Sequence, residues 1–134
     1  MFNIKLLKET EKMPIALKRI YEAPVPQDGY RVLVDRLWPR GLSKERTKID
    51  QWLKEAAPSD WLRKSFHSGE LSWDDFERSY LLELEKHEKI LKTLVEHSRK
   101  DQVTLLFSSK NEEKNNASVL KHYLIKLESR KELF

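Results

Sequence analysis

Two uninterrupted apolar runs constrain the fold of this 134-residue chain more than any other feature. The first begins "YRVLVDRLW", residues 30–38, and the second is "QVTLLFSS", residues 102–109. A strand with one face in water alternates apolar and polar residues, and the central residues of these two runs do not. Strands that are apolar on both faces are typical of parallel sheets covered by other elements. We therefore predict that both runs are central strands of an α/β protein.

The segments before the long helical region predict one more strand and two short helices. "IALKRIY", residues 15–21, reads as a strand, and the "EAPVPQDG" that follows reads as a loop. Residues 1–14 fit either an irregular segment or an additional short strand. "DQWLKEAA", residues 50–57, predicts a short helix that the next proline ends. Ser59 then caps a second helix, "SDWLRKSFH".

Residues 73–99 carry the longest helical pattern, with an apolar stripe on one side and Glu–Lys pairs four residues apart on the other. His87 falls on the stripe, and we interpret it as a half-buried structural residue. A last helix is predicted almost directly after the second apolar run, because Ser109 and Glu112 have capping-box spacing. The fold prediction is a single layered domain over residues 1–134, with a small, mostly parallel sheet of three or four strands flanked by helices.

The chemistry-bearing residues gather where the two apolar runs end. If the two strands are parallel neighbours, their carboxyl ends share one edge of the sheet, where ligands of open α/β sheets bind. Asp35 is the candidate base or orienting residue. Arginines there suit phosphate or carboxylate, and a helix N-terminus adds amide donors. The candidate ligand-binding residues are Arg36, Trp38, Arg40, Ser108, Ser109, Lys110, Asn115 and Asn116.

Arg63 and His67 are secondary candidates, because they lie four residues apart on one face of a predicted helix and can line the same crevice. The alternative for His67 is a solvated side chain beside a structural helix. The charged end of the first run has an alternative as well: it can be a structural knot, in which Asp35 and the arginines bind loop carbonyls. The sequence leaves both pairs of alternatives open.

Three functions follow from these patterns. The first is an α/β protein that binds an anionic small molecule, with or without enzymatic activity on a phosphate- or carboxylate-bearing substrate. The second is a nucleic-acid-binding module, since residues 1–50 hold 11 Lys/Arg against 7 Asp/Glu. In this function Trp38 would stack on bases. Its phosphate contacts would be Arg31, Arg40, Lys44, Arg46 and Lys48. The third function is that of an interaction protein with a purely structural cluster.

Several other site types lack a signal in this sequence. There is no cysteine, and three glycines do not supply a phosphate-binding loop. The four histidines show no metal-ligand spacing, and no serine lies in a nucleophile-elbow motif. No apolar run approaches the ~18 residues of a membrane span, and the first residues have no apolar segment of a signal peptide. We expect a cytoplasmic protein without metal, cofactor or membrane partner. The sequence does not indicate whether the chain forms oligomers.

Three blocks resemble the DUF488 family of small bacterial proteins: "KRIYEAPVPQDGYRVLVDRLWPRGLSKE", "AAPSDWLRKSFH" and "VTLLFSSKNEEKNNASVL". The resemblance covers about residues 15–127, and "VDRLWPRG" is its most specific part. It implies a compact α/β cytoplasmic protein, supports treating the three blocks as one site, and implies no particular activity. This chain departs from the family pattern at Ser65, where an aromatic is common. It departs again at Asn111, often aspartate, and at Lys114, often histidine. If that acid and histidine are catalytic in relatives, this chain lacks both.

Overall fold

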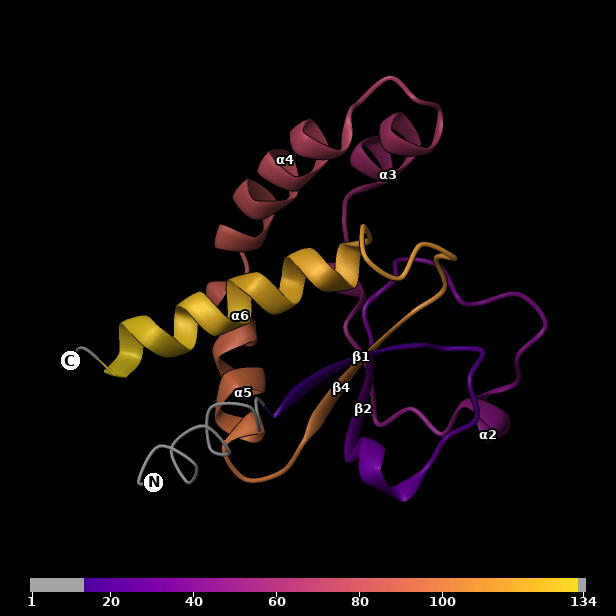
Figure 1. Ribbon diagram of the computed structural model, residues 1–134, viewed down its shortest axis with the longest axis vertical. Helices are drawn as coiled ribbons and strands as arrows, with labels where there is room; N and C mark the ends of the chain where they lie inside the picture. Colours follow the sequence, from indigo (N-terminus) through magenta and orange to yellow (C-terminus); the bar gives the residue numbers. More distant parts are fainter. Residues whose placement is uncertain (1–13, 133–134) are drawn as a thin grey trace, which may run out of the picture.

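The computed structural model describes residues 14–132 and contains an all-parallel four-stranded sheet (Figure 1). The two predicted central strands are confirmed as neighbours, with Tyr30 opposite Val103 and Leu33 opposite Leu106. The α/β class with a small parallel sheet is therefore confirmed. Of the segment 1–14, only Pro14 is among the described residues. The sheet order is β1-β4-β2-β3, with β1 at Ile15–Arg19, β2 at Tyr30–Leu33, β3 at Gln51–Trp52 and β4 at Val103–Phe107.

Two of the α-helices cover one face of the sheet, and two others lie beyond its carboxyl ends. In Figure 1, α6 crosses the sheet with α5 beside it, whereas α3 and α4 lie beyond the carboxyl ends of the strands. No helix within residues 14–132 is long and apolar enough to cross a membrane. The α-helices are α2 at Lys44–Thr47, α3 at Asp60–His67, α4 at Trp73–Glu85, α5 at Glu88–Ser98 and α6 at Asn116–Glu132; 3-10 turns occupy Pro26–Asp28 and Lys54–Ala56.

The helix predicted over residues 50–57 is wrong. Its first part is β3, which pairs with β2, and only its second part forms a 3-10 turn. The backbone amide of Leu53 donates to the carbonyl of Leu33 at 2.8 Å, and the indole Nε1 of Trp52 donates to the carbonyl of Asp35 at 2.7 Å. Contacts with a strand twenty residues away therefore override the local helical pattern, and no local signal carries them.

The single long helix predicted over residues 73–99 is also wrong, because it consists of α4 and α5 with a break at Lys86 and His87. The amides of these two residues donate to Glu83 and Leu84, three residues back, so the α-helical spacing ends there. The two helices then pack differently: α4 contacts α3 and α6, whereas α5 contacts α6 and β4. Because of the break, the apolar stripe of residues 73–99 packs against α3 and α6 in its first half and against α6 and β4 in its second half.

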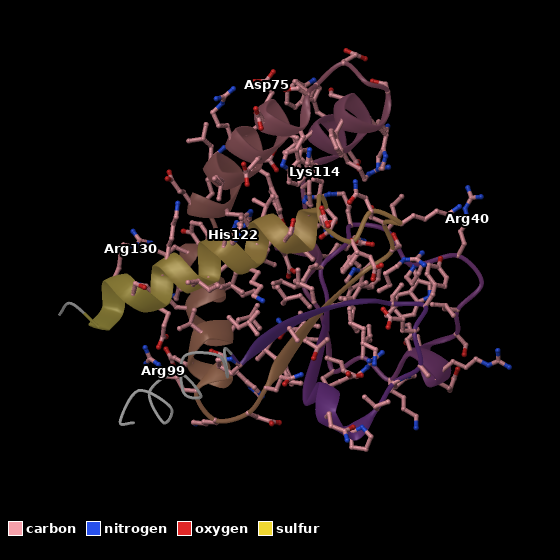
Figure 2. All side chains as sticks on the ribbon, viewed as in Figure 1. Arg40, Asp75, Arg99, Lys114, His122 and Arg130 are labelled. Atoms are coloured by element: carbon pink, nitrogen blue, oxygen red, sulfur yellow. The ribbon has the colours of Figure 1, made fainter. Side chains whose placement is uncertain are left out.

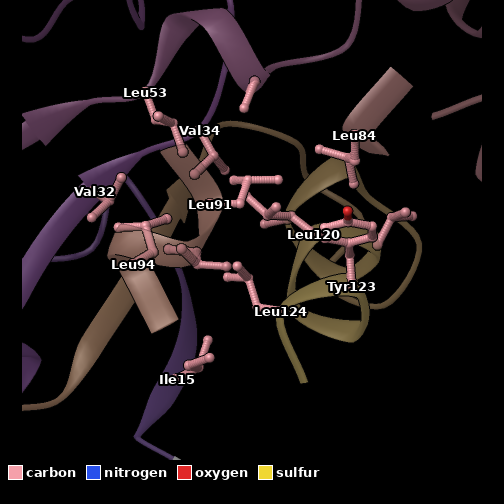
Figure 3. Packing of buried hydrophobic residues seen from close by; sticks show 14 of the residues in the cluster. Ile15, Val32, Val34, Leu53, Leu84, Leu91, Leu94, Leu120, Tyr123 and Leu124 are labelled. Atoms are coloured by element: carbon pink, nitrogen blue, oxygen red, sulfur yellow. The ribbon is translucent and has the colours of Figure 1, made fainter. Parts of the chain in front are cut away.

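The core lies on both faces of the sheet, which explains the unbroken apolar runs. Val32 and Val34 point to the face covered by α5 and α6, where they join Leu91, Leu94 and the other residues labelled in Figure 3. Leu33 points to the opposite face. There a smaller cluster contains Ile20, Leu33 and Leu106, covered by Trp38, Leu42, Ile49 and Trp52. The segment after β2, and not a helix layer, therefore covers the second face.

Candidate functional site

A pocket of about 560 Å³ opens at the carboxyl ends of the strands. Its volume lies within the roughly 300–1,000 Å³ that small-molecule sites occupy. All the predicted candidates lie in its lining: the parallel strands bring their carboxyl ends to one edge, and α3 supplies Arg63 and His67. These residues are Asp35, Arg36, Trp38, Arg40, Arg63, His67, Ser108, Ser109, Lys110, Asn115 and Asn116.

The Asp35 carboxylate joins three elements at the base of the pocket. Its Oδ2 accepts hydrogen bonds from the Ser108 amide at 2.9 Å and the Ser108 hydroxyl at 2.7 Å. Its Oδ1 accepts from Nδ2 of Asn116 at 2.9 Å, and the same Nδ2 donates to the Val34 carbonyl. Both carboxylate oxygens are thus engaged within the protein. Asp35 holds the loop after β4 and the first residue of α6 against the end of β2.

Two of the arginines that line the pocket bind carbonyl oxygens of its loops. Arg36 donates through Nε to Pro58 at 2.8 Å and through Nη2 to Ala57 at 3.3 Å. Arg19, at the end of β1, donates in the same way to Ser109 and Ser108. Sequence reasoning missed Arg19, although a charged residue that ends a third parallel strand is the same signal that pointed to Arg36. These arginines shape the loops around the pocket.

Three other cations of the lining are uncommitted. The exposed side chains of Arg40, Lys110 and Lys114 have no hydrogen-bond or ion-pair partner within residues 14–132. Figure 2 shows Arg40 on the loop after β2 and Lys114 beside the N-terminal end of α6. Arg63 is weakly held, because its Nη2 lies 3.4 Å from an oxygen of Asp60 and its buried Nε has no acceptor.

The electrostatic balance of the pocket is strongly positive. Among residues 14–132, Asp35 is the one carboxylate in the lining, and both of its oxygens accept hydrogen bonds from the protein. A cleft lined by one sign of charge focuses its field and attracts ligands of the opposite sign. The cations that face this one acid are Arg19, Arg36, Arg40, Arg63, Lys110 and Lys114.

Apolar side chains form much of the remaining lining. The Phe66 ring of α3 packs on the Phe76 ring of α4 at a centroid distance of 4.7 Å. Trp38 packs edge-on against Trp52 at 5.3 Å and donates from Nε1 to the carbonyl of Leu42. Next to Phe76, the buried Tyr80 hydroxyl donates to the carbonyl of Ala56 at 2.6 Å. Burial raises the pKa of Tyr80 far above its usual range, so the phenol stays neutral.

The polar residues of the third sequence block mainly build the loop and cap α6. The helix starts at Asn116, so the predicted start beside Ser109 is wrong. Asn115 caps it, because its Oδ1 accepts from the Ser118 amide at 2.9 Å. Asn111 Oδ1 accepts from the amides of Glu113 and Lys114, which keeps the loop open for eight residues after β4. His67 is exposed, and its ring lies 6.2 Å from the Phe66 ring.

One of the five predicted nucleic-acid contacts is buried, and the other four are exposed. Arg31 is 4 % exposed, and its guanidinium binds the Asp28 carboxylate and the Thr47 carbonyl, so the predicted phosphate contact at Arg31 is wrong. Trp38 is half-buried between the pocket and Trp52.

No group of three or more His, Cys, Asp or Glu side chains in the described part of the chain is arranged to hold a metal ion.

Comparisons with known proteins give one family. A family model described as "Inactive DUF488-N3 subclade" matches residues 14–132. The uncharacterized protein YeaO of Escherichia coli is 46% identical over 112 residues, which cover 84% of this chain and 97% of YeaO. The uncharacterized protein Rv3073c of Mycobacterium tuberculosis is 39% identical over 79 residues, covering 59% of this chain and 64% of that protein. No solved structure gives a significant match.

Proposed function

This chain belongs to the DUF488 family, and from that premise we propose that it binds an anionic small molecule and catalyses no reaction on it. The observation that carries the proposal is the group of uncommitted cations, Arg40, Lys110 and Lys114, at the mouth of a preformed pocket. Several other exposed cations of the described residues pair with nearby acids, as Arg78 does with Asp75 and Arg130 does with Glu88. Those of the pocket have room for a ligand oxygen.

The binding role is supported by the state of the one acid in the pocket. A general base needs a free lone pair within hydrogen-bond reach of the proton it removes. The Asp35 carboxylate already accepts three hydrogen bonds within the protein, two from Ser108 and one from Asn116, and we assign it as a residue that positions the loop after β4. We infer that Arg36 acts in the same way on the loop that contains Pro58.

The absence of catalysis is supported by two residues and by the family description. Asn111 and Lys114 stand where the family pattern often has an aspartate and a histidine. The Asn111 amide neither takes up nor releases a proton at neutral pH, and the Lys114 ammonium group has no lone pair with which to act as a base. The matched family model carries the word "Inactive" in its description. Lys114, however, adds a positive charge to the pocket, which favours retention of an anion.

The test is calorimetric titration of the full chain with methyl phosphate and with acetate, at low and high salt. The variants are Arg40→Ala and Lys114→Ala, and the matched control is Arg46→Ala, which removes an exposed arginine outside the pocket. We expect saturable binding that falls roughly tenfold in each pocket variant, since a hydrogen bond to a charged group is lost, and remains unchanged in the control.

A short single-stranded oligonucleotide in the same titration separates this function from nucleic-acid binding. Binding of the oligonucleotide alone, weakened as much by Arg46→Ala as by Arg40→Ala and lost at high salt, would contradict the proposal. Failure of both small anions to bind would contradict it as well.

A further inference from the structure

We infer that the ligand is an aromatic anion, with a phosphate or carboxylate group carried on a flat apolar ring; this inference rests on the proposed function. The pocket is far larger than a single phosphate group requires. The space beyond the cations is walled by rings and aliphatic groups, including Phe66, Phe76, Leu37 and Pro58. An apolar wall contributes to the binding free energy of a ligand with apolar surface, and it does not stabilise a hydrated ion.

The arrangement of α3 places a cation directly beside an aromatic ring. Arg63 and Phe66 are three residues apart, so their side chains lie on one face of the helix. The planar guanidinium of Arg63 can stack on a ring and bind an anionic oxygen at once, which a lysine cannot do. In the described part of the chain, the Arg63 guanidinium is held only by the contact with Asp60 at 3.4 Å, so it is available for both. A ligand with a ring next to its charged group can therefore contact Arg63 and Phe66 at the same time.

The apolar residues of the pocket are also incompletely covered by the protein. Leu37 is 56% exposed, and the Phe66 ring is half-buried even though it contacts Phe76 and Trp73. Phe76 itself is 3% exposed and forms a fixed base beneath Phe66. A bound ring would remove the exposed apolar surface from water, and this gain is absent for a ligand without a ring.

The experiment compares matched pairs of ligands by titration calorimetry with the full chain. Phenyl phosphate against methyl phosphate, and benzoate against acetate, differ by the ring; phenol is the ring without the charge. We expect each aromatic anion to bind at least about tenfold more tightly than its aliphatic partner, and phenol to bind far more weakly than phenyl phosphate. The pair with the larger affinity identifies whether phosphate or carboxylate is preferred.

Two variants locate the ring preference. In Phe66→Leu the ratio of phenyl phosphate to methyl phosphate affinity should fall about threefold or more, while methyl phosphate still binds. The matched control is Trp61→Leu, which removes an exposed aromatic from the same helix outside the pocket and should leave the ratio unchanged. If Phe66→Leu does not fold, Leu37→Ser at an exposed pocket position tests the same contact.

The outcomes distinguish this inference from the function on which it rests. Equal affinities for methyl and phenyl phosphate would overturn the aromatic ligand and leave the anion site intact. Binding of phenol as tight as that of phenyl phosphate, or binding of none of these anions, would overturn the anion site itself. A ring preference that both Phe66→Leu and Leu37→Ser leave unchanged would place the ring elsewhere and overturn the contact with these walls.

Discussion

Two carboxylates at opposite ends of β2 organise the residues around that strand. Asp35 binds neutral donors at the carboxyl end, whereas Asp28 lies at the amino end between two cations. The Asp28 oxygens accept from Lys18 Nζ at 3.0 Å and from Arg31 Nη1 at 2.5 Å, and Asp28 is 5% exposed. Removal of one partner from such a cluster leaves a buried charge without compensation.

The pH dependence of stability tests the role of Asp28. Burial acts to raise the pKa of this carboxyl, but hydrogen bonds from the Val25 amide, Lys18 and Arg31 outweigh it and hold the pKa below its ordinary 3.8. A group with a lowered native pKa stabilises the fold above its unfolded-state pKa, and this stabilisation is lost as the pH falls through the native pKa. We therefore expect Asp28→Asn to lower the free energy of unfolding by roughly 3 kcal/mol at neutral pH.

Urea unfolding at a series of pH values from neutral to acid measures this effect. The difference between wild type and Asp28→Asn should shrink as the pH falls below 3.8, because protonation removes the same charge. Asp74→Asn, which changes an exposed carboxylate of α4, is the control and should have a much smaller effect on the free energy of unfolding. A difference of equal size at all pH values would show that the charge of Asp28 is not what stabilises the fold.

At the residue scale, the sequence predicted which side chains surround the pocket better than it predicted what they bind. The positions of Asp35, Arg36 and Ser108 follow from two strand ends and parallel pairing. Their hydrogen bonds to Asn116 and to Pro58 depend on where the helices and loops end, and a single sequence does not encode that in local patterns. Lys114 lay in a recognised block, but it became visible as an unpaired cation only from the structure.

The pocket wall formed by α3 depends on a link between two helices. Ser59 caps α3, since its hydroxyl accepts from the Leu62 amide at 3.2 Å. The Glu83 carboxylate of α4 then accepts from the Ser59 amide at 2.9 Å and from its hydroxyl at 2.6 Å. The start of α3 is thereby fastened to the end of α4, which fixes the helix that carries Arg63 and Phe66.

A double-mutant cycle measures this link. We expect Ser59→Ala and Glu83→Ala each to lower the free energy of unfolding by about 1 kcal/mol. The double variant should lose less than the sum, by about 1 kcal/mol, because both changes remove the hydrogen bond between the Ser59 hydroxyl and the Glu83 carboxylate. The control cycle pairs Glu83→Ala with Ser72→Ala, whose hydroxyl caps α4 by accepting from Asp75. That pair should be additive, and additivity of the Ser59–Glu83 pair would disprove the link.

At the element scale, the errors of prediction share one physical cause. β3 and the start of α6 at Asn116 depend on contacts between segments far apart in the chain, and the two helices on either side of the break at His87 pack against different elements. The elements that the sequence did predict include β1, β2, β4 and α3, and they carry their signal locally in strand patterns or in a cap. Propensity is a weak prior wherever tertiary contacts compete with it.

At the scale of the whole molecule, the central strands are expected to be its most stable part. β2 and β4 have neighbours on both sides, and the residues of β4 are all buried. β3 has two residues at the edge of the sheet. Amide hydrogen exchange followed by NMR should therefore be slowest in β2 and β4, and faster in β3 by at least about tenfold. Equal protection of β3 and β4 would show that the edge strand opens only with global unfolding.

The segment after β2 serves the pocket and the core at the same time. Trp38 lines the pocket, yet together with Leu42 and Trp52 it also covers Leu33 and Leu106 on the second face of the sheet. Mutational freedom is therefore unevenly distributed around the pocket. A lineage under selection for a new ligand can exchange Lys110 or Lys114 without disturbing folding. A substitution of Trp38 would change the pocket and the core together. We therefore expect ligand specificity to diversify through the residues after β4.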